Sequence, residues 1–361
     1  MVKKPMLGDL MRDHGISRRG FLKYCATLAS VMALPPALAP KIAHALENAP
    51  RPSVIWLSFQ ECTGCTEAIT RSHSPSIEDL IFNAISLDYH HTLQAASGDA
   101  AEHAREEAMK EHWGKYVLIV DGSIPLEEGY SCIAGISNLQ MLKDTAEGAA
   151  AIVSVGTCAA FGGIPHANPN PTNAVSVGDI IKDKPIINVP GCPPIPIVMT
   201  GVLAHFLTFG LPELDELNRP KAFFGETIHD RCYRRPFYDK GLFAESFDDQ
   251  GAREGWCLYK LGCKGPTTKS VCATVKWNDH TSFPIEAGHP CLGCTEPDFW
   301  DNGGFYKPLS APAGDYRRLG QAAIGAGAAL GVASAALSRM NKTKAAANHE
   351  TVDAHDLEKK S

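Results

Sequence analysis

The sequence lacks an excess of positive charge, because 34 Lys and Arg stand against 40 Asp and Glu in a chain of 361 residues. It also lacks basic runs interleaved with aromatic side chains, which a nucleic-acid groove requires. These two absences exclude nucleic acid as a partner. Only 20% of the residues are charged and 44% are hydrophobic, which excludes disorder as the main state and allows one large or two ordinary domains.

The N-terminal 45 residues have the features of an export signal. Basic residues lead into a twin-arginine motif at 17–23, an apolar stretch follows over 24–38, and an Ala-x-Ala cleavage site ends at Ala45. Three prolines between residues 35 and 40 argue against the alternative of one buried helix. We therefore predict a signal peptide over residues 1–45. Its removal takes away seven Lys or Arg and two Asp, so the mature chain has a formal charge of −11.

Charge is absent from residues 319–338, which lie within the C-terminal segment 311–361. At about 1.5 Å per residue, twenty helical residues just span the roughly 30 Å apolar layer of a membrane. The basic residues that follow Arg339 would lie on the cytoplasmic side. A soluble packing helix is the alternative, because Ala and Gly are only mildly hydrophobic. We predict a single-pass anchor in the inner membrane, with the folded domains on the periplasmic side.

Two regions of different character follow the signal. Residues 46–220 contain short apolar runs at 54–57, 116–120, 151–155 and 185–189, which predict strands of a buried parallel sheet. Helical spacing at 77–85 and 100–112 completes an α/β doubly wound fold. Residues 221–310 lack regular periodicity and are richer in Pro, Gly, Trp and Cys. They predict a smaller, loop-rich domain that is held together by something other than a large apolar core.

Four cysteines follow the predicted strands of the first domain. Cys62 and Cys65 come after the first strand, Cys158 after the third and Cys192 after the fourth. Because the carboxyl ends of parallel strands converge on one crevice, we expect these four thiols to meet. Four thiols suit either a tetrahedral zinc ion or a cubane iron–sulfur cluster, and spacing alone does not separate the two. The neighbouring Gly and Pro residues favour a cluster modestly.

The second domain contains seven further candidate ligands, which divide into two groups. One group has four members, and the other has only three thiols. Three thiols do not close a structural zinc site, but they suit a three-iron cluster that lacks one corner. The group of four is His229, Cys232, Cys257 and Cys263, and the group of three is Cys272, Cys291 and Cys294.

A disulfide framework is the alternative use of these cysteines in an exported chain. It predicts an even number of cysteines, whereas 11 of the 12 would remain in the mature chain. It also does not explain the two CxxC pairs or the twin-arginine signal. Metal is therefore the better interpretation. Cys132 follows no paired spacing, and we predict that it is an inert buried thiol.

Long, specific strings distributed over essentially the whole chain resemble those of one family, the small subunits of membrane-bound nickel–iron hydrogenases. The resemblance implies a flavodoxin-like domain followed by an iron–sulfur domain. The strings are Ser17-Arg18-Arg19-x-Phe21-Leu22-Lys23, Glu61-Cys62-Thr63-Gly64-Cys65, Val189-Pro190-Gly191-Cys192-Pro193-Pro194, His229-Asp230-Arg231-Cys232-Tyr233-Arg234-Arg235-Pro236, Gly262-Cys263-Lys264-Gly265-Pro266-Thr267-Thr268 and Gly288-His289-Pro290-Cys291-x2-Cys294.

The resemblance also implies a role for each cysteine group. Cys62, Cys65, Cys158 and Cys192 would hold a proximal 4Fe-4S cluster, and Cys272, Cys291 and Cys294 a medial 3Fe-4S cluster. His229, Cys232, Cys257 and Cys263 would hold a distal 4Fe-4S cluster. The nickel–iron centre would lie on a separate large subunit. Electrons from hydrogen oxidation would pass through the three clusters to a membrane cytochrome b and quinone. A cluster subunit of a respiratory quinone reductase would share only the first cysteine group.

Three further expectations depend on this resemblance. Glu61 would face the large subunit and could relay protons, although a surface acid at the interface is an equally good interpretation. Some relatives tolerate oxygen through two extra cysteines near the proximal cluster, and here those places are Gly64 and Gly163. Pro284 would stand where a fourth cysteine would complete the medial cluster.

Overall fold

The computed structural model describes residues 51–309 except 74–75, 82–84 and 302–304, together with 34–48 and six isolated earlier positions. Residues up to Leu309 belong to one compact unit. Most of the predicted signal peptide and all of the predicted anchor at 319–338 lie outside the described residues. Within the described part, none of the helices is long and apolar enough to cross a membrane.

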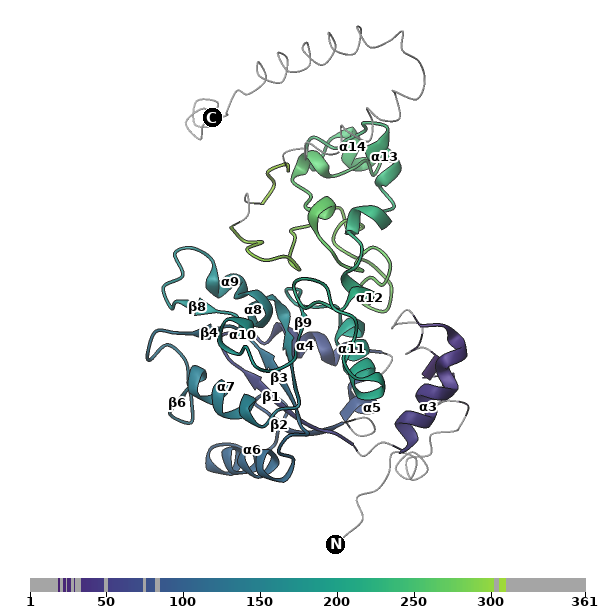
Figure 1. Cartoon of the computed structure of the whole chain (residues 1–361). Coiled ribbons are helices and arrows are strands. Elements are labelled where there is room, and N and C mark those ends of the chain that lie inside the picture. Colours follow the sequence, from purple (N-terminus) through teal and green to yellow (C-terminus); the bar gives the residue numbers. More distant parts are fainter. Residues whose placement is uncertain are drawn as a thin grey trace, which may run out of the picture. The chain divides into compact units, whose positions relative to one another are not determined.

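Five parallel strands form the central sheet of the first domain (Figure 1). They pair in the spatial order β2-β1-β3-β7-β9, which is 2-1-3-4-5 along the chain and is the flavodoxin-like order. The predicted doubly wound parallel sheet is therefore confirmed. The strands are β1 (Ser53–Ser58), β2 (Ser86–His90), β3 (Val117–Asp121), β7 (Ala151–Val155) and β9 (Ile186–Val189).

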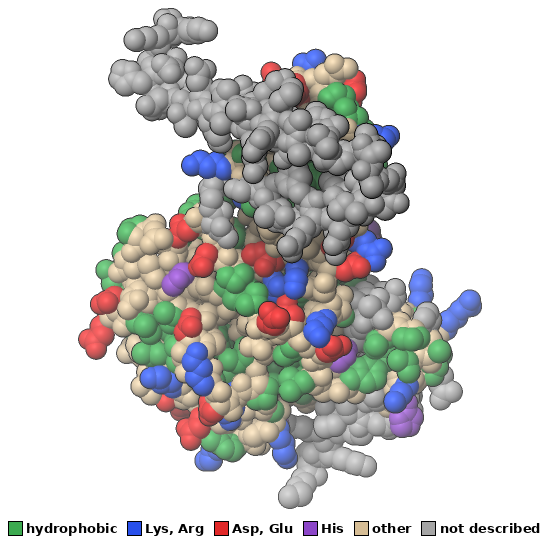
Figure 2. All heavy atoms as spheres, turned by 45° about the horizontal axis from the view of Figure 1, so that its top comes forward, with side chains coloured by type: hydrophobic (Ala, Val, Ile, Leu, Met, Phe, Trp, Pro, Cys, Tyr) green, Lys and Arg blue, Asp and Glu red, His purple; other side chains and the backbone are tan. Residues whose placement is uncertain are grey.

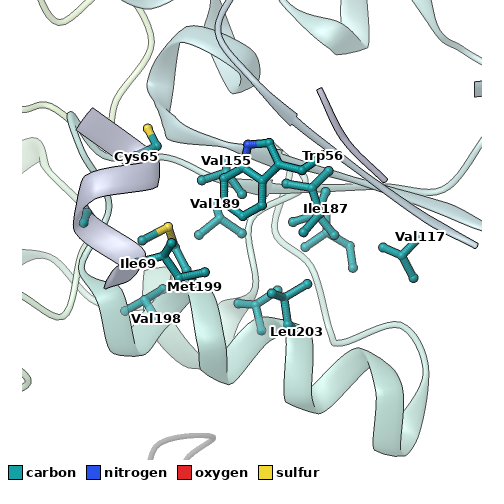
Figure 3. Packing of buried hydrophobic residues seen from close by; sticks show 14 of the residues in the cluster. Trp56, Cys65, Ile69, Val117, Val155, Ile187, Val189, Val198, Met199 and Leu203 are labelled. Carbon is teal, nitrogen blue, oxygen red and sulfur yellow. The ribbon is translucent and has the colours of Figure 1, made fainter. Parts of the chain in front are cut away.

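Side chains that alternate along these strands build two apolar layers, one on each face of the sheet. On β1, Val54 and Trp56 belong to one layer, and Ile55 and Leu57 to the other. Helices α4 (Gly64–Thr70) and α11 (Pro196–Phe209) cover the first layer, which Figure 3 shows with Cys65 at its margin. Helices α6 (Asp99–Glu111) and α7 (Asn138–Glu147) cover the second. Both faces of the sheet are thus buried, as a parallel sheet requires.

The remaining elements of this region are short, apart from a ten-residue helix at the N-terminal end. The chain enters through η1 (Pro36–Leu38) and α3 (Ala39–Asn48), so the predicted cleavage point after Ala45 lies within a helix whose first turn contains Pro40. The others are α5 (Ile77–Asp79), α8 (Gly156–Phe161), α9 (Gly163–His166), α10 (Val177–Ile180), β4 (Ile124–Pro125), β5 (Cys132–Ile133), β6 (Ile136–Ser137) and β8 (Ala174–Val175).

Two features of this domain differ from the sequence prediction. Strand β2 was not predicted, because its sequence SLDYH is polar and it lies at the edge of the sheet, where only Tyr89 and His90 are buried. The prediction that Cys132 is buried is wrong, because this thiol is exposed. Cys132 lies in the small hairpin of β5 and β6, and neither apolar layer of the sheet includes it. The apolar character of the thiol alone is therefore not enough to bury it.

The region predicted as a second domain, residues 221–310, consists of short helical turns and loops where the structure describes it. One small apolar cluster lies within it, and three of the predicted cysteine ligands, Cys232, Cys263 and Cys291, are members of that cluster. Sequence-distant loops thus meet around cysteines rather than around a large apolar core. Its helical elements are α12 (Lys221–Phe224), η3 (Ile228–Arg231), α13 (Arg235–Asp239), α14 (Gln250–Arg253), η4 (Tyr259–Leu261) and η5 (Gly265–Thr267).

Charged side chains of both signs are interspersed on the face of the molecule shown in Figure 2. Most surface ion pairs are short-range partners, such as Arg231 with Glu226 and Arg235 with Asp239. Such exposed pairs contribute at most about 1 kcal/mol each. The chemistry of the protein therefore has to be sought at its buried groups.

Candidate metal centres

Four thiols lie at the carboxyl ends of the sheet strands. Cys62 follows β1, Cys65 lies in the first turn of α4, Cys158 lies in α8 directly after β7, and Cys192 follows β9. Burial, and then the charges of Cys192 and Cys62 among other groups, raises the pKa of Cys158 to about 12. Burial also raises the pKa of Cys65, with smaller contributions from Cys158 and Cys192. The sheet thus brings these four thiols together, and we call them the proximal group.

Three glycines hold the backbone close to the proximal group. A Cβ atom at Gly156 would lie 2.6 Å from Cys65 Sγ, and one at Gly163 would lie 2.8 Å from Cys158 Sγ. A Cβ atom at Gly64 would lie 3.1 Å from Cys62 Sγ. Room around the thiols therefore depends on the absence of side chains at these positions. This arrangement fits a bulky inorganic core that needs close approach of the backbone.

A single metal ion fits the described thiols less well than a cluster does. A zinc ion would hold its thiolates at about 2.3 Å from one point. In the part of the chain that the structure describes, no three His, Cys, Asp or Glu side chains are arranged to hold one metal ion. Of the two alternatives that the spacing left open, the close backbone approach at Gly64, Gly156 and Gly163 favours the iron–sulfur cluster.

Three thiols of the second domain line a cavity of about 190 Å³, together with Pro284. These thiols are Cys272, Cys291 and Cys294, and we call them the medial group. Burial, more than the charge of Cys294, raises the pKa of Cys272 to about 12. The backbone N–H of Gly293 donates a hydrogen bond to Cys291 Sγ at 3.4 Å. The cavity therefore offers the three medial thiols and a backbone donor to Cys291, and Cys192 of the proximal group and Pro284 also lie on its lining.

The remaining predicted ligands, His229, Cys232, Cys257 and Cys263, are called the distal group. Burial raises the pKa of Cys257 to about 11, and the charges of Cys263 and Cys232 add to this effect. His229 lies in η3, whose N-terminus is closed by a reciprocal capping box between Thr227 and Asp230.

A close approach at Gly265 joins His229 to this group. A Cβ atom at Gly265 would lie 3.4 Å from Cys263 Sγ and 3.8 Å from the His229 backbone nitrogen. The ring of His229 contacts Tyr238 edge-on, with 4.6 Å between the ring centroids. The fold therefore places the backbone of His229 near Cys263, while the imidazole packs on Tyr238.

The three groups form a continuous row. The backbone N–H of Cys192 lowers the pKa of Cys294 by hydrogen bonding, which links the proximal and medial groups. The backbone N–H of Cys291 acts in the same way on Cys263, which links the medial and distal groups. Lys264, next to Cys263, also donates its backbone N–H to the Cys291 carbonyl at 2.8 Å. Cys192 and Cys294 also line the same cavity, so each group lies beside the next.

Thr157 is a residue of this region that the sequence analysis missed. It is 1% exposed, and its hydroxyl accepts a hydrogen bond from the Gly191 N–H at 2.9 Å. The same hydroxyl donates to the carbonyl oxygen of Cys294. Thr157 therefore joins the loops of the proximal group to the medial group. Its position next to Cys158 was the available signal, but a threonine in a turn has many commoner roles.

Two carboxyl groups lie beside the proximal group. Glu61 is half-buried, its Oε2 atom is buried without a hydrogen-bond partner, and burial raises its pKa. Asp121 is 1% exposed at the end of β3, and burial followed by the charge of Glu61 raises its pKa to about 7. The sequence analysis selected Glu61 and missed Asp121, although an acid directly after a buried apolar run was a usable signal.

Two family models match the chain. One describes the C-terminal part of NiFe/NiFeSe hydrogenase small subunits and matches residues 224–307. The other describes the 20 kDa subunit of NADH ubiquinone oxidoreductase and matches residues 62–206. The first match includes the medial and distal groups, and the second includes the proximal group.

Similar proteins give a consistent result. The chain is 53% identical over 305 residues to the uptake hydrogenase small subunit of Azotobacter vinelandii, covering 84% of this chain and 85% of the relative. It is 51% identical over 300 residues to the hydrogenase-1 small chain of Escherichia coli K12, covering 82% and 81%. A NiFeSe hydrogenase structure from Desulfomicrobium baculatum has a TM-score of 0.68 at 36% identity, covering 72% of this chain and 100% of that chain.

The flavodoxin-like sheet and its row of thiol groups define an iron–sulfur electron-transfer protein. The similarity covers more than four fifths of the chain at about half identity. The chain belongs to the family of small subunits of nickel–iron hydrogenases.

Proposed function

We propose that this chain relays electrons one at a time through three clusters: a 4Fe-4S cluster in the proximal group, a 3Fe-4S cluster in the medial group and a 4Fe-4S cluster in the distal group. The observation that best supports this order is that each group lies beside the next: Cys192 lines the cavity of the medial thiols, and Lys264, next to Cys263, donates its backbone N–H to the Cys291 carbonyl. Iron–sulfur clusters supply one-electron carriers. The chain's own residues supply the thiolates, the N–H donors and the burial that set each potential.

The partner at the proximal end is the hydrogenase large subunit, and the nickel–iron centre that splits hydrogen belongs to it. Cys62 is exposed and Glu61 is half-buried at this end of the row. A ligand that is exposed in the single chain is compatible with a partner surface that covers it. Electrons would therefore enter at Cys62 and leave near His229.

The physiological acceptor would be a membrane cytochrome b, which passes the electrons to quinone. The predicted twin-arginine signal at 1–45 and the uncharged segment at 319–338 support a location on the periplasmic side of the inner membrane. The names of the similar uptake hydrogenases support the direction of hydrogen oxidation. Both membrane features lie largely outside the described residues.

Iron analysis of the purified complex tests the cluster assignment. The three clusters require about eleven iron atoms per small subunit, and a three-iron signal should be visible by electron paramagnetic resonance after oxidation. A disulfide-linked binding protein would contain no iron and would be colourless. A relay with only the proximal group would contain about four iron atoms.

Glu61→Gln is expected to slow hydrogen turnover by about 10²-fold, because a positioned proton-transfer group typically contributes at least that much. The substitution keeps the size of the side chain and removes its ability to exchange protons. Hydrogen–deuterium exchange and dye reduction should fall together. Glu67→Gln is the control, because Glu67 is an exposed partner of Arg71 in the same segment. Unchanged exchange in Glu61→Gln would show that Glu61 is only a surface acid.

Truncation after Ala311 is expected to release the exported, assembled enzyme from the membrane, because the predicted anchor at 319–338 is then missing. Every proposed ligand precedes Leu309, so dye-linked activity should stay within about twofold of the full-length enzyme. Washed membranes and the soluble fraction are assayed for hydrogen-dependent dye reduction. Activity that remains on the washed membranes would contradict anchoring by this segment.

A further inference from the structure

The described part of the chain buries the side chains of four cations. The exposed fraction is 4% for Arg105, 2% for Arg219, 5% for Arg234 and 7% for Lys264. A buried cation is costly unless an anion balances it. The four residues differ in how this balance is achieved.

Two of the four buried cations have carboxylate partners, although Arg219 also donates to the carbonyl of Thr295, next to Cys294. Arg105 pairs with Glu102 at 3.0 Å. Arg219 pairs with both Asp215 and Glu296, each at 2.9 Å. Both arginines are thus paired with an anion, as charged side chains buried in proteins usually are.

The other two buried cations lie next to thiol ligands and have uncharged oxygen partners. Arg234 donates from Nε to the Tyr233 hydroxyl at 2.7 Å and from Nη1 to the Trp256 carbonyl at 2.8 Å. Lys264 donates from Nζ to the Lys307 carbonyl at 2.7 Å. Neither forms an ion pair with a carboxylate among the described residues. The anion that balances them therefore has to come from another source.

Arg234 lies beside the distal group. It lies two residues after Cys232, and its guanidinium bonds to the carbonyl of Trp256, the residue before Cys257. It therefore connects the two loops that present these thiols. The thiolates and the cluster that they hold are the anions available to this cation.

We propose that Arg234 is the counter-charge of the distal cluster and raises its reduction potential, an inference that rests on the proposed function. Each transfer moves one electron from the medial to the distal cluster, so negative charge increases at the distal group and no proton is needed. A buried cation stabilises this more negative state, because charges interact strongly where water is excluded. Arginine suits the role, because its planar guanidinium offers several donors in a fixed geometry.

The test is a redox titration of the purified heterodimer, followed by electron paramagnetic resonance of the distal cluster. Arg234→Gln is expected to shift the one-electron equilibrium at least tenfold toward the oxidised cluster, which corresponds to a potential lower by 59 mV. Arg231→Gln is the matched control. It removes the same charge three residues away, from a side chain that is 59% exposed and paired with Glu226. The reduction potential of the distal cluster in Arg231→Gln should equal that in the unmodified enzyme.

Two further variants separate charge from shape. Arg234→Met keeps the apolar stem and should lower the potential as Gln does, whereas Arg234→Lys keeps the charge and should leave the potential near its original value. Loss of the distal cluster in the Gln and Met variants, with retention in the Lys variant, would also support the counter-charge role.

Three results would overturn the inference. They are an unshifted potential in Arg234→Gln, an equal shift in Arg231→Gln, and loss of the distal cluster in all three Arg234 variants. Absence of a distal 4Fe-4S signal from the unmodified enzyme would instead overturn the proposed function.

Discussion

Pro284→Cys is expected to convert the medial 3Fe-4S cluster into a 4Fe-4S cluster and to lower its reduction potential by on the order of 100 mV or more. Pro284 lines the same cavity as the three thiols of the medial group. It stands between Phe283 and Ile285, which are 4% and 3% exposed and hold this turn in place. Proline provides neither a thiolate nor a backbone N–H, so it cannot bind iron or donate to a sulfide.

Electron paramagnetic resonance of the oxidised variant measures this conversion directly. The three-iron signal should disappear in Pro284→Cys and persist in Pro284→Ala, which removes the ring without adding a thiol. Hydrogen oxidation should fall only modestly, because the clusters on either side still exchange electrons with the medial one. An undiminished three-iron signal in Pro284→Cys would mean that Pro284 is not at the missing corner.

Exposure to air is expected to abolish nearly all hydrogen oxidation by this enzyme. By family resemblance, oxygen tolerance depends on two extra cysteines near the proximal cluster, and this chain has Gly64 and Gly163 at those places. Both glycines lie close to ligand sulfur atoms. A Cβ atom at Gly64 would lie 3.1 Å from Cys62 Sγ, and one at Gly163 would lie 2.8 Å from Cys158 Sγ. Thiols at these two positions would reach the cluster, and hydrogen atoms there cannot bind iron. The proximal group therefore has the four thiols of an ordinary cubane.

Hydrogen-dependent dye reduction, recorded before and during admission of oxygen, tests this expectation. The anaerobic rate of the same preparation is the reference. Hydrogen oxidation that continues in air at a rate near the anaerobic one would contradict the assignment of an ordinary proximal cubane.

Local sequence pattern was sufficient for most of the sheet. Buried parallel strands are short apolar runs, and the predicted runs at 54–57, 116–120, 151–155 and 185–189 coincide closely with β1, β3, β7 and β9. The pattern failed where burial is incomplete. Edge strand β2 is polar, and the helical spacing at 77–85 contains only the three-residue helix Ile77–Asp79 as a described α-helix. Cys132 was misjudged because burial of a lone cysteine depends on its surroundings in three dimensions.

The sequence by itself was enough to predict the candidate ligands and their division into groups of four, three and four, because CxxC pairs and strand-end positions have direct chemical meaning. Only the tertiary structure decided which groups are neighbours. Cys192 and Cys294 line one cavity, and Lys264 donates its backbone N–H to the Cys291 carbonyl, so loops far apart in the chain meet.

Tertiary structure also revealed Thr157, Asp121 and Arg234, whose roles depend on burial and on partners distant in sequence. Arg231, Arg234 and Arg235 look alike in the sequence. They differ in the fold, where only Arg234 is buried and has no carboxylate partner among the described residues. The physical reason is that the free energy of a charge depends on its solvent exposure and on its counter-charges, and neither can be read from the order of residues.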